Sequence, residues 1–193
     1  MAHLPVQIAV LDACVLYPAT LRNFILRLAE EEAFIPVWSD EIVGEFVRGV
    51  LRDRPAVKPE NLHRTVWLMN NAFPDALVVG YGNLIKTLTL PDPNDRHVLA
   101  AALKARATTI VTLNLKDFPA DTLSKHDVVA VHPDDFVAGL LKSDPKMVER
   151  ALHEQQRSLK NPPVTVADLL TTLEAQGMVQ TVKVLRKRQV VDI

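Results

Sequence analysis

The stretch "VQIAVLDACVLYPATLRNFILRLAEEEAFIPVW", residues 6–38, places two short apolar runs on either side of a segment with helical periodicity. The first run, residues 6–12, is almost continuously apolar and ends in Asp12, as expected of a strand buried on both faces. The second run, residues 34–38, is another strand candidate. The order strand, helix, strand favours an α/β fold. The apolar residues that repeat with the spacing of a helix face between the runs are Leu21, Phe24, Ile25 and Leu28.

The same alternation continues along the chain to about residue 141. Segments with helical patterns are followed by short runs rich in β-branched residues, and turn-forming or polar residues separate them. Strands that alternate with helices predict an α/β layer fold with a mainly parallel sheet. The further strand candidates are residues 76–80, 108–114 and 127–132, and helical patterns cover residues 39–51, 60–72, 93–106 and 133–141.

Beyond residue 141 the strand signals stop and only helical patterns remain. One helix is predicted over residues 145–159. Thr165 and Asp168 form a capping-box pattern for the next helix, and Gly177 suits its carboxyl-terminal cap. A last helical segment covers residues 179–189. We therefore predict a first domain over residues 1–141 and a helical extension over residues 142–193.

Composition excludes several classes of protein. The chain has 193 residues and is 48% hydrophobic, which suits one compact domain with an appendage. Cys14 is the single cysteine, so there is neither an intramolecular disulfide nor a cysteine-based zinc site, and it is predicted to be a small buried apolar residue. The six histidines lack paired ligand spacing. Trp38 and Trp67 are predicted to lie in the core rather than to stack on bases.

The amino-terminal segment is apolar but does not have the pattern of a signal peptide. Residues 1–21 contain no basic leader, and Asp12 interrupts their apolar run. No apolar run approaches the roughly 18 residues that a membrane span needs. We therefore expect a cytoplasmic protein.

Charge is distributed unevenly along the chain. The net charge is −1, so a broad basic surface for nucleic acid is not expected. Residues 1–140 hold 13 Lys and Arg against 17 Asp and Glu, whereas residues 141–193 hold 9 against 6. The run "KVLRKR", residues 183–188, either contacts RNA phosphates, or contacts an acidic segment of a partner, or is simply a solvated helix end.

Several carboxylates occupy positions that suit either a helix cap or a metal ligand. Asp12 ends a predicted parallel strand, and ligands bind at the carboxyl ends of such strands. In "LPDPNDRHVLAAAL", residues 90–103, Asp92 is the better helix cap because it precedes the proline. Asp95 instead shares the apolar face of the following helix, where a pure cap has no need to point. Both interpretations remain open for these acids.

Other polar residues lie near the same predicted sheet edge. Glu45 flanks the apolar stripe of the helix over residues 39–51, and taken alone it is a typical solvated residue. Thr112, Asn114 and Asp117 follow the strand over residues 108–112, where they are either turn formers or part of a site. Carboxylates that crowd together repel one another unless a cation joins them, and oxygen ligands suit Mg²⁺ or Mn²⁺.

Four segments in this order resemble the PIN-domain nucleases, and most of all the VapC-type toxins of bacterial toxin–antitoxin systems. The resemblance covers about residues 7–137 and implies a three-layer α/β/α fold with a mainly parallel sheet. The segments are "VLDACVLYPA" (10–19), "WSDEIVGEF" (38–46), "DPNDRHVLAAAL" (92–103) and "VTLNLKDFP" (111–119).

The resemblance implies a function and a set of site residues. The function is metal-dependent hydrolysis of RNA phosphodiester bonds by an endoribonuclease, with Mg²⁺ or Mn²⁺ as cofactor, RNA as substrate and a cognate antitoxin as partner; it also allows a homodimer. Family members place the last acid at either of two positions, and here the first of these is an asparagine. The implied catalytic metal ligands are Asp12, Glu45, Asp95 and Asp117, with Asp92, Thr112 and Asn114 in support.

Two other functions remain open at this point. Because Asn114 stands where an acid can occur, the chain is also compatible with a PIN fold that binds without cleaving. A nuclease that acts on single-stranded DNA is the other alternative. Cleavage assays on RNA and DNA with and without metal distinguish these functions.

Overall fold

The structure is a computed structural model that describes residues 7–188 and residue 190. It divides into two compact units. The first contains the described residues up to Tyr17 together with Ile35–Val131, and the second contains Pro18–Phe34 together with the described residues from His132 onwards. Each unit therefore draws on two separate parts of the chain.

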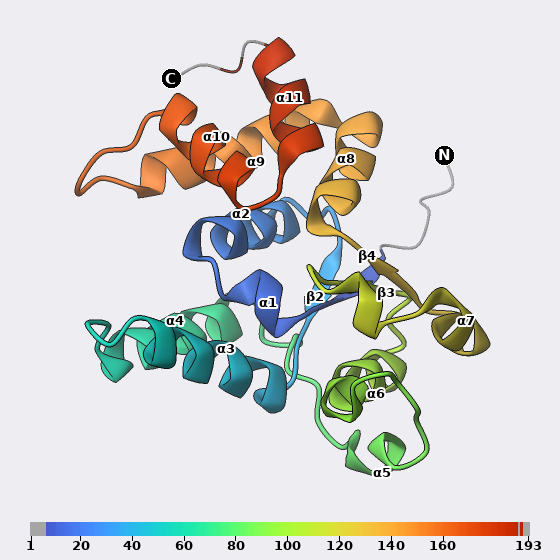
Figure 1. Cartoon of the computed structure of the whole chain (residues 1–193). Helices are drawn as coiled ribbons and strands as arrows, with labels where there is room; N and C mark the ends of the chain where they lie inside the picture. The colour runs from blue at the N-terminus through green and yellow to red at the C-terminus, as the bar shows by residue number, and fades with distance from the viewer. Residues whose placement is uncertain (1–6, 189, 191–193) are drawn as a thin grey trace. The chain divides into compact units, whose positions relative to one another are not determined.

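A four-stranded sheet forms the centre of the first unit (Figure 1). Its strand order is β2-β1-β3-β4, and every pairing is parallel, with Val10 opposite Val37 on one side and Ile110 on the other. This confirms the predicted α/β fold with a parallel sheet. The strands are β1 (Ile8–Leu11), β2 (Ile35–Val37), β3 (Thr109–Val111) and β4 (Val129–Val131).

The two central strands are buried as the apolar runs predicted. Ala9, Val10 and Leu11 of β1 have no exposed surface, and Ile110 and Val111 of β3 have none either. A strand buried on both faces needs apolar residues at every position rather than at alternate ones. The expected strand over residues 76–80 is wrong, because within the described residues it contributes only an isolated bridge between Trp38 and Leu77.

The helices of the first unit follow the predicted periodicities. The hydroxyl of Ser39 caps α3 by accepting a hydrogen bond from the amide of Ile42 at 3.3 Å. Helix α6 packs against β1 and β3 and ends at Arg106, whose φ is 55°. The helices are α1 (Ala13–Leu16), α3 (Asp40–Asp53), α4 (Pro59–Ala72), α5 (Gly82–Ile85), α6 (Arg96–Ala105) and α7 (Ala120–Leu123).

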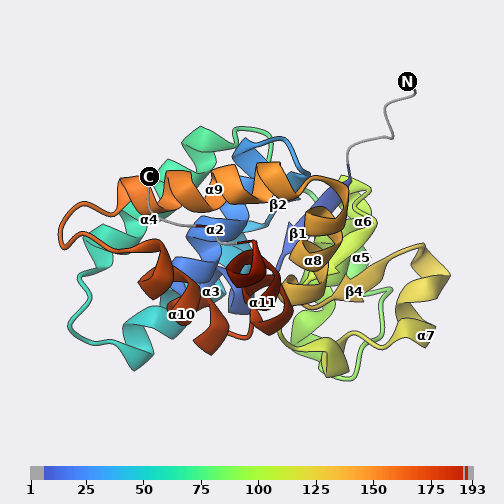
Figure 2. The same cartoon turned by 90° about the horizontal axis from the view of Figure 1, so that it is seen from above.

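The second unit is helical, and Figure 2 shows α9 beside α2. Gln155 of α9 donates a hydrogen bond to the carbonyl of Thr20 at 3.0 Å, and Arg150 pairs with Glu31 at 2.7 Å. The Thr165–Asp168 capping box is confirmed. The helices are α2 (Ala19–Glu30), α8 (Pro133–Ser143), α9 (Pro145–Ser158), α10 (Val166–Ala175) and α11 (Val179–Lys187).

The helical unit extends further than the sequence suggested. Helices α2 and α8 belong to it, although both precede residue 142 wholly or in large part. Helix α2 joins because it packs against α9 and α10, and a local sequence pattern does not reveal such a distant partner. The predicted division of the chain at residue 141 stays a prediction.

Two side-chain environments differ from the expectation. Trp38 is completely buried, as predicted, but the side chain of Trp67 is 62% exposed on α4, so its assignment to the core is wrong. Cys14 is only partly buried and contacts polar groups. In the part of the chain that the structure describes, no helix is both long and apolar enough to span a membrane.

Candidate active site

Asp12 and Thr112 lie together because β1 and β3 are adjacent and parallel. Leu11 is opposite Val111 in the register, so the residue after each strand emerges at the same edge of the sheet. The hydroxyl of Thr112 donates a hydrogen bond to Oδ2 of Asp12 at 2.6 Å, and both residues are buried. The other oxygen of Asp12 accepts the amide of Ala13 at 2.6 Å, so Asp12 also caps α1.

The two acids of "DPND" have different environments. The carboxylate of Asp92 accepts the amide of Asn94 at 2.8 Å and caps the 3₁₀ turn Pro93–Asp95. Asp95 stands at the start of α6, but its side chain makes no capping hydrogen bond. The capping interpretation therefore fits Asp92 and does not account for Asp95.

Asp95 lies in an anionic environment. Burial raises its pKa to about 6, and the negative charges of four other acids act in the same direction. Each of these charges disfavours a further ionised carboxylate, so a cation at this place would be favoured. The four acids, in order of their effect, are Asp12, Asp117, Asp92 and Glu45. The structure thus brings every predicted acid into electrostatic range of Asp95.

Glu45 has a partner that the sequence did not reveal. Its Oε1 lies 3.1 Å from Nε2 of His97, which is 2% exposed, and Oε2 of Glu41 lies 3.9 Å from the other ring nitrogen. Burial opposes a positive charge on His97, but the Glu45 hydrogen bond and the nearby carboxylates outweigh it and raise the pKa of His97. His97 therefore links α6 to the acidic start of α3. In the sequence, only its position two residues after Asp95 could have indicated that His97 lies near the site.

The segment after β3 is joined to the same cluster. The amide of Asn114 donates a hydrogen bond to the hydroxyl of Thr112 at 3.0 Å. The side-chain amide of Asn114 donates to the carboxylate of Asp117, which lies in the 3₁₀ turn Leu115–Asp117. Asn114 therefore takes part in the cluster by orienting the carboxylate of Asp117, although it carries no acid itself.

Cys14 is a member of this cluster that the sequence interpretation missed. Its thiol lies 3.1 Å from Oδ2 of Asp12, and its sulfur accepts the amide of Leu113 at 3.2 Å. Burial and the charge of Asp12 raise the pKa of the thiol to about 12. Cys14 is therefore a neutral donor toward Asp12, and not a thiolate that attacks or binds a metal.

The donor set fits a hard divalent cation by its chemistry. The candidate ligands are carboxylates, which Mg²⁺ and Mn²⁺ prefer, and their mutual repulsion favours a bound cation. Within residues 7–188 and 190, however, no three Asp, Glu, His or Cys side chains stand close enough to hold a metal ion. Metal binding would therefore require side chains to draw together, with Glu45 turning from His97.

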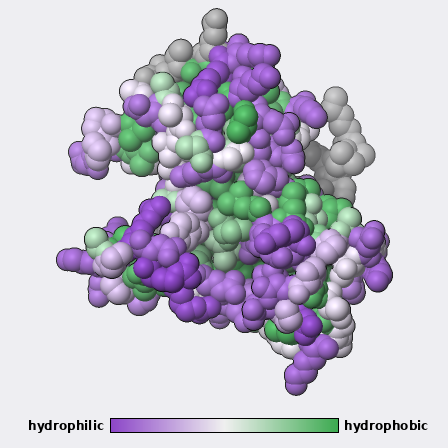
Figure 3. Space-filling model, viewed as in Figure 1, coloured by the Kyte–Doolittle hydropathy of each residue, from purple (hydrophilic) through white to green (hydrophobic). Residues whose placement is uncertain are grey.

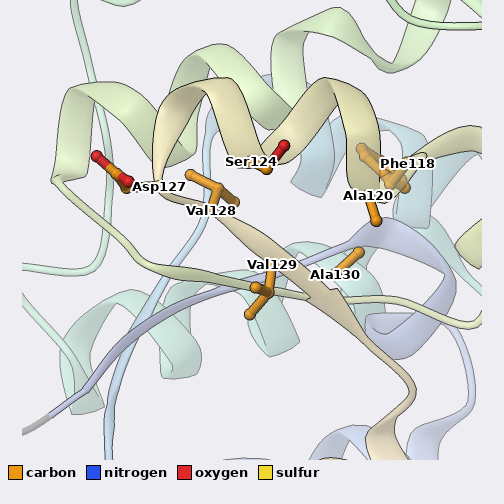
Figure 4. Close-up of a pocket in the computed structure, with 7 residues that line it drawn as sticks. All are labelled: Phe118, Ala120, Ser124, Asp127, Val128, Val129 and Ala130. Carbon is orange, nitrogen blue, oxygen red and sulfur yellow. The ribbon is translucent and has the colours of Figure 1, made fainter.

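A pocket elsewhere in the first unit does not contain these residues. It measures about 500 Å³ and lies between β4 and the segment around α7 (Figure 4). Its lining is apolar apart from Ser124 and Asp127 and includes none of the acids near Asp95. The candidate active site is thus the sheet edge and not this pocket.

The geometry defines a parallel α/β protein with an acidic centre at the carboxyl ends of β1 and β3. The chain belongs to the PIN domain family, because the family model described as PIN domain matches residues 9–116. A second family model, described as VapC50 C-terminal domain, matches residues 133–187. These matches confirm the resemblance to VapC-type PIN proteins.

One curated relative is a "Putative ribonuclease VapC50" from Mycobacterium tuberculosis (strain ATCC 25618 / H37Rv). The two sequences are 38% identical over 106 residues, which cover 55% of this chain and 62% of the relative. The match therefore spans less than two thirds of the relative's length. No solved structure matches the chain.

Proposed function

We propose that this protein is a metal-dependent endoribonuclease and the toxin of a toxin–antitoxin pair. The observation that carries the proposal is the environment of Asp95, which shares its charge field with Asp12, Glu45, Asp92 and Asp117. Negative charges that act on one another in this way destabilise the ionised carboxylates when no cation is bound. Such an arrangement is therefore expected at a cation-binding site. The PIN domain match and the name of the relative support a ribonuclease.

We assign the metal, Mg²⁺ or Mn²⁺, to Asp12, Glu45, Asp95 and Asp117. When bound, such a metal polarises a phosphate and lowers the pKa of an attacking water. Thr112 holds Asp12 by its hydroxyl, and Asn114 holds Asp117 by its amide. These contacts fix the orientation of the two carboxylates. Hydrolysis would leave a 5′-phosphate and a 3′-hydroxyl.

The proposal includes partners and a place of action. RNA is the substrate, an antitoxin protein is the partner, and the proposal also allows a homodimer. The chain would act in the cytoplasm, where bacterial RNA is available. The name of the relative and the VapC50 C-terminal domain match support the toxin assignment.

The test is cleavage of labelled single-stranded RNA, with DNA of the same sequence beside it. Purified protein is expected to cut RNA in the presence of Mg²⁺ or Mn²⁺ and to stop when EDTA is added. Undiminished cleavage in EDTA would contradict the metal mechanism. Preference for DNA would indicate the alternative nuclease, and binding without cleavage would indicate a binding module.

A further inference from the structure

Helix α3 separates its charges along its length. The charged residues of its first two turns are all acids, namely Asp40, Glu41 and Glu45. Glu45 is one of the proposed metal ligands. From Arg48 onwards the balance reverses, since residues 46–72 hold five Lys and Arg against two Asp and Glu. Figure 3 shows that hydrophilic residues predominate over α3 and α4 on the face in view. Positively charged residues therefore predominate along the sequence from one helical turn after Glu45.

Arg48 is the first of these positively charged residues, and its guanidinium lies back along the helix. A Cβ atom added to Gly44 would stand 2.9 Å from Nη1 of Arg48 and 3.7 Å from its Cζ. The guanidinium therefore covers the turn that contains Gly44 and Glu45, which precede Arg48 by four and three residues. Any larger residue at position 44 would force the guanidinium to move.

Arg48 makes no polar contact within the part of the chain that the structure describes. It is exposed, and it forms neither a hydrogen bond nor an ion pair with any described residue. Glu45 is directed to His97 instead, and Asp53 pairs with Arg52 at 2.7 Å. The donors of the Arg48 guanidinium are thus available to an anionic ligand.

We propose that Arg48 binds a phosphate of the RNA strand adjacent to the scissile bond, and that the missing side chain of Gly44 leaves room for the guanidinium on this turn. The inference rests on the proposed function. An RNA strand that crosses the acidic centre brings its neighbouring phosphates toward carboxylates that repel them. A planar guanidinium one helical turn from Glu45 would offset the repulsion and grip a phosphate through two parallel hydrogen bonds.

The experiment measures RNA binding without cleavage. A fluorescent single-stranded RNA of mixed sequence is titrated with the full chain in EDTA, and its anisotropy is followed over a series of salt concentrations. Arg48→Gln is expected to weaken binding about tenfold, as for loss of one charge-assisted contact. It should also lower the slope of log affinity against log salt by about 0.7, the value for one phosphate on a single strand. Arg48→Lys should retain the slope while losing part of the affinity.

Gly44→Ala separates the position of the guanidinium from its charge. Alanine favours a helix interior over glycine, so this variant should melt at a higher temperature. It should nevertheless weaken RNA binding, because its Cβ displaces Arg48. In the Arg48→Gln background, Gly44→Ala should have no further effect on binding. Independent, additive losses from the two changes would overturn the role assigned to Gly44.

Lys86→Gln is the matched control, since it removes one exposed positive charge from another part of the same unit. It should leave the affinity almost unchanged. Equal losses in Lys86→Gln and Arg48→Gln, or full affinity with an unchanged slope in Arg48→Gln, would overturn the inference and leave the proposed nuclease intact. Failure of the parent protein to bind RNA at any salt concentration would overturn the inference, whereas absence of RNA cleavage with Mg²⁺ or Mn²⁺ would overturn the proposed function.

Discussion

Asp92 and Asp95 are three residues apart, but only Asp92 makes a capping hydrogen bond. Asparagine is itself a good cap, so Asp92→Asn should change the free energy of unfolding by less than about 0.5 kcal/mol and keep most of the cleavage activity. Asp95→Asn should reduce cleavage about a hundredfold or more, because it removes a proposed ligand of the metal. Without metal it should be at least as stable as the parent, since it relieves repulsion.

Chemical denaturation and single-turnover cleavage of both variants test this contrast. If metal-free Asp95→Asn is clearly destabilised and still cleaves RNA at the parental rate, then Asp95 serves the helix and not the metal.

The raised pKa of Asp95 predicts how the free energy of unfolding changes with pH. Its ordinary value is 3.8 and its value in the folded chain is about 6, so the folded chain holds this proton more tightly than the unfolded chain. The stability that Asp95 contributes is complete below pH 3.8 and is lost as the pH rises through about 6. Mg²⁺ favours the ionised carboxylate, so the stabilisation by Mg²⁺ should grow over the same range.

Urea denaturation of the parent and of Asp95→Asn at a series of pH values isolates this effect as a difference between two curves. Parallel curves in the absence of metal would show that Asp95 is not perturbed by its neighbours.

Thr112 is expected to matter through its hydroxyl alone. Thr112→Val keeps the shape of the buried side chain but removes the donor to Asp12 and the acceptor of the Asn114 amide. Leaving these groups unpaired should cost about 1–3 kcal/mol of stability. Cleavage should fall about tenfold or more, as for other groups that orient a metal ligand. Thr112→Ser should restore both properties, and a Ser variant as impaired as Val would place the defect in packing.

At the scale of elements, α11 is expected to contribute little to RNA binding. Arg186 pairs with Glu174, and Arg188 pairs with Glu149, so half of the cations of "KVLRKR" already have partners. Removing residues 183–193 is not a clean test, because it would also remove the fully buried Leu185. The double variant Lys183→Gln, Lys187→Gln should leave the salt dependence of RNA binding unchanged. A slope reduced by about 1.4, equivalent to two phosphates, would assign α11 to the RNA surface.

The sequence predicted the elements whose signals are local. The apolar runs of β1 and β3, the capping box at Thr165 and the acids that follow the strands can all be recognised within a few neighbouring residues. The pairing of Glu45 with His97 joins residues 52 positions apart, and no local pattern encodes it. The same holds for the packing of α2 with α9, which changed the composition of the second unit.

At the scale of the whole molecule, all the candidate site residues belong to the first compact unit. A ligand that binds only the native state stabilises the part of the chain whose folding creates its site, by about 2.7 kcal/mol at one hundred times its dissociation constant. Mg²⁺ should therefore raise the melting temperature of the first unit. If calorimetry resolves two transitions, only one should shift, and Asp95→Asn should shift less. Equal shifts of both transitions would indicate metal sites outside the acidic centre.

The hydrogen bond between Thr112 and Asp12 joins residues that are 100 positions apart. During synthesis the chain emerges from its amino terminus at about 5–20 residues per second, and contacts this distant form late. A ribosome-bound fragment that ends before Thr112 has the first acid but neither β3 nor the hydroxyl that holds this acid in place. We therefore expect a cell that makes this protein to be shielded from it during translation, because the proposed catalytic arrangement arises only when the last third of the first unit has folded.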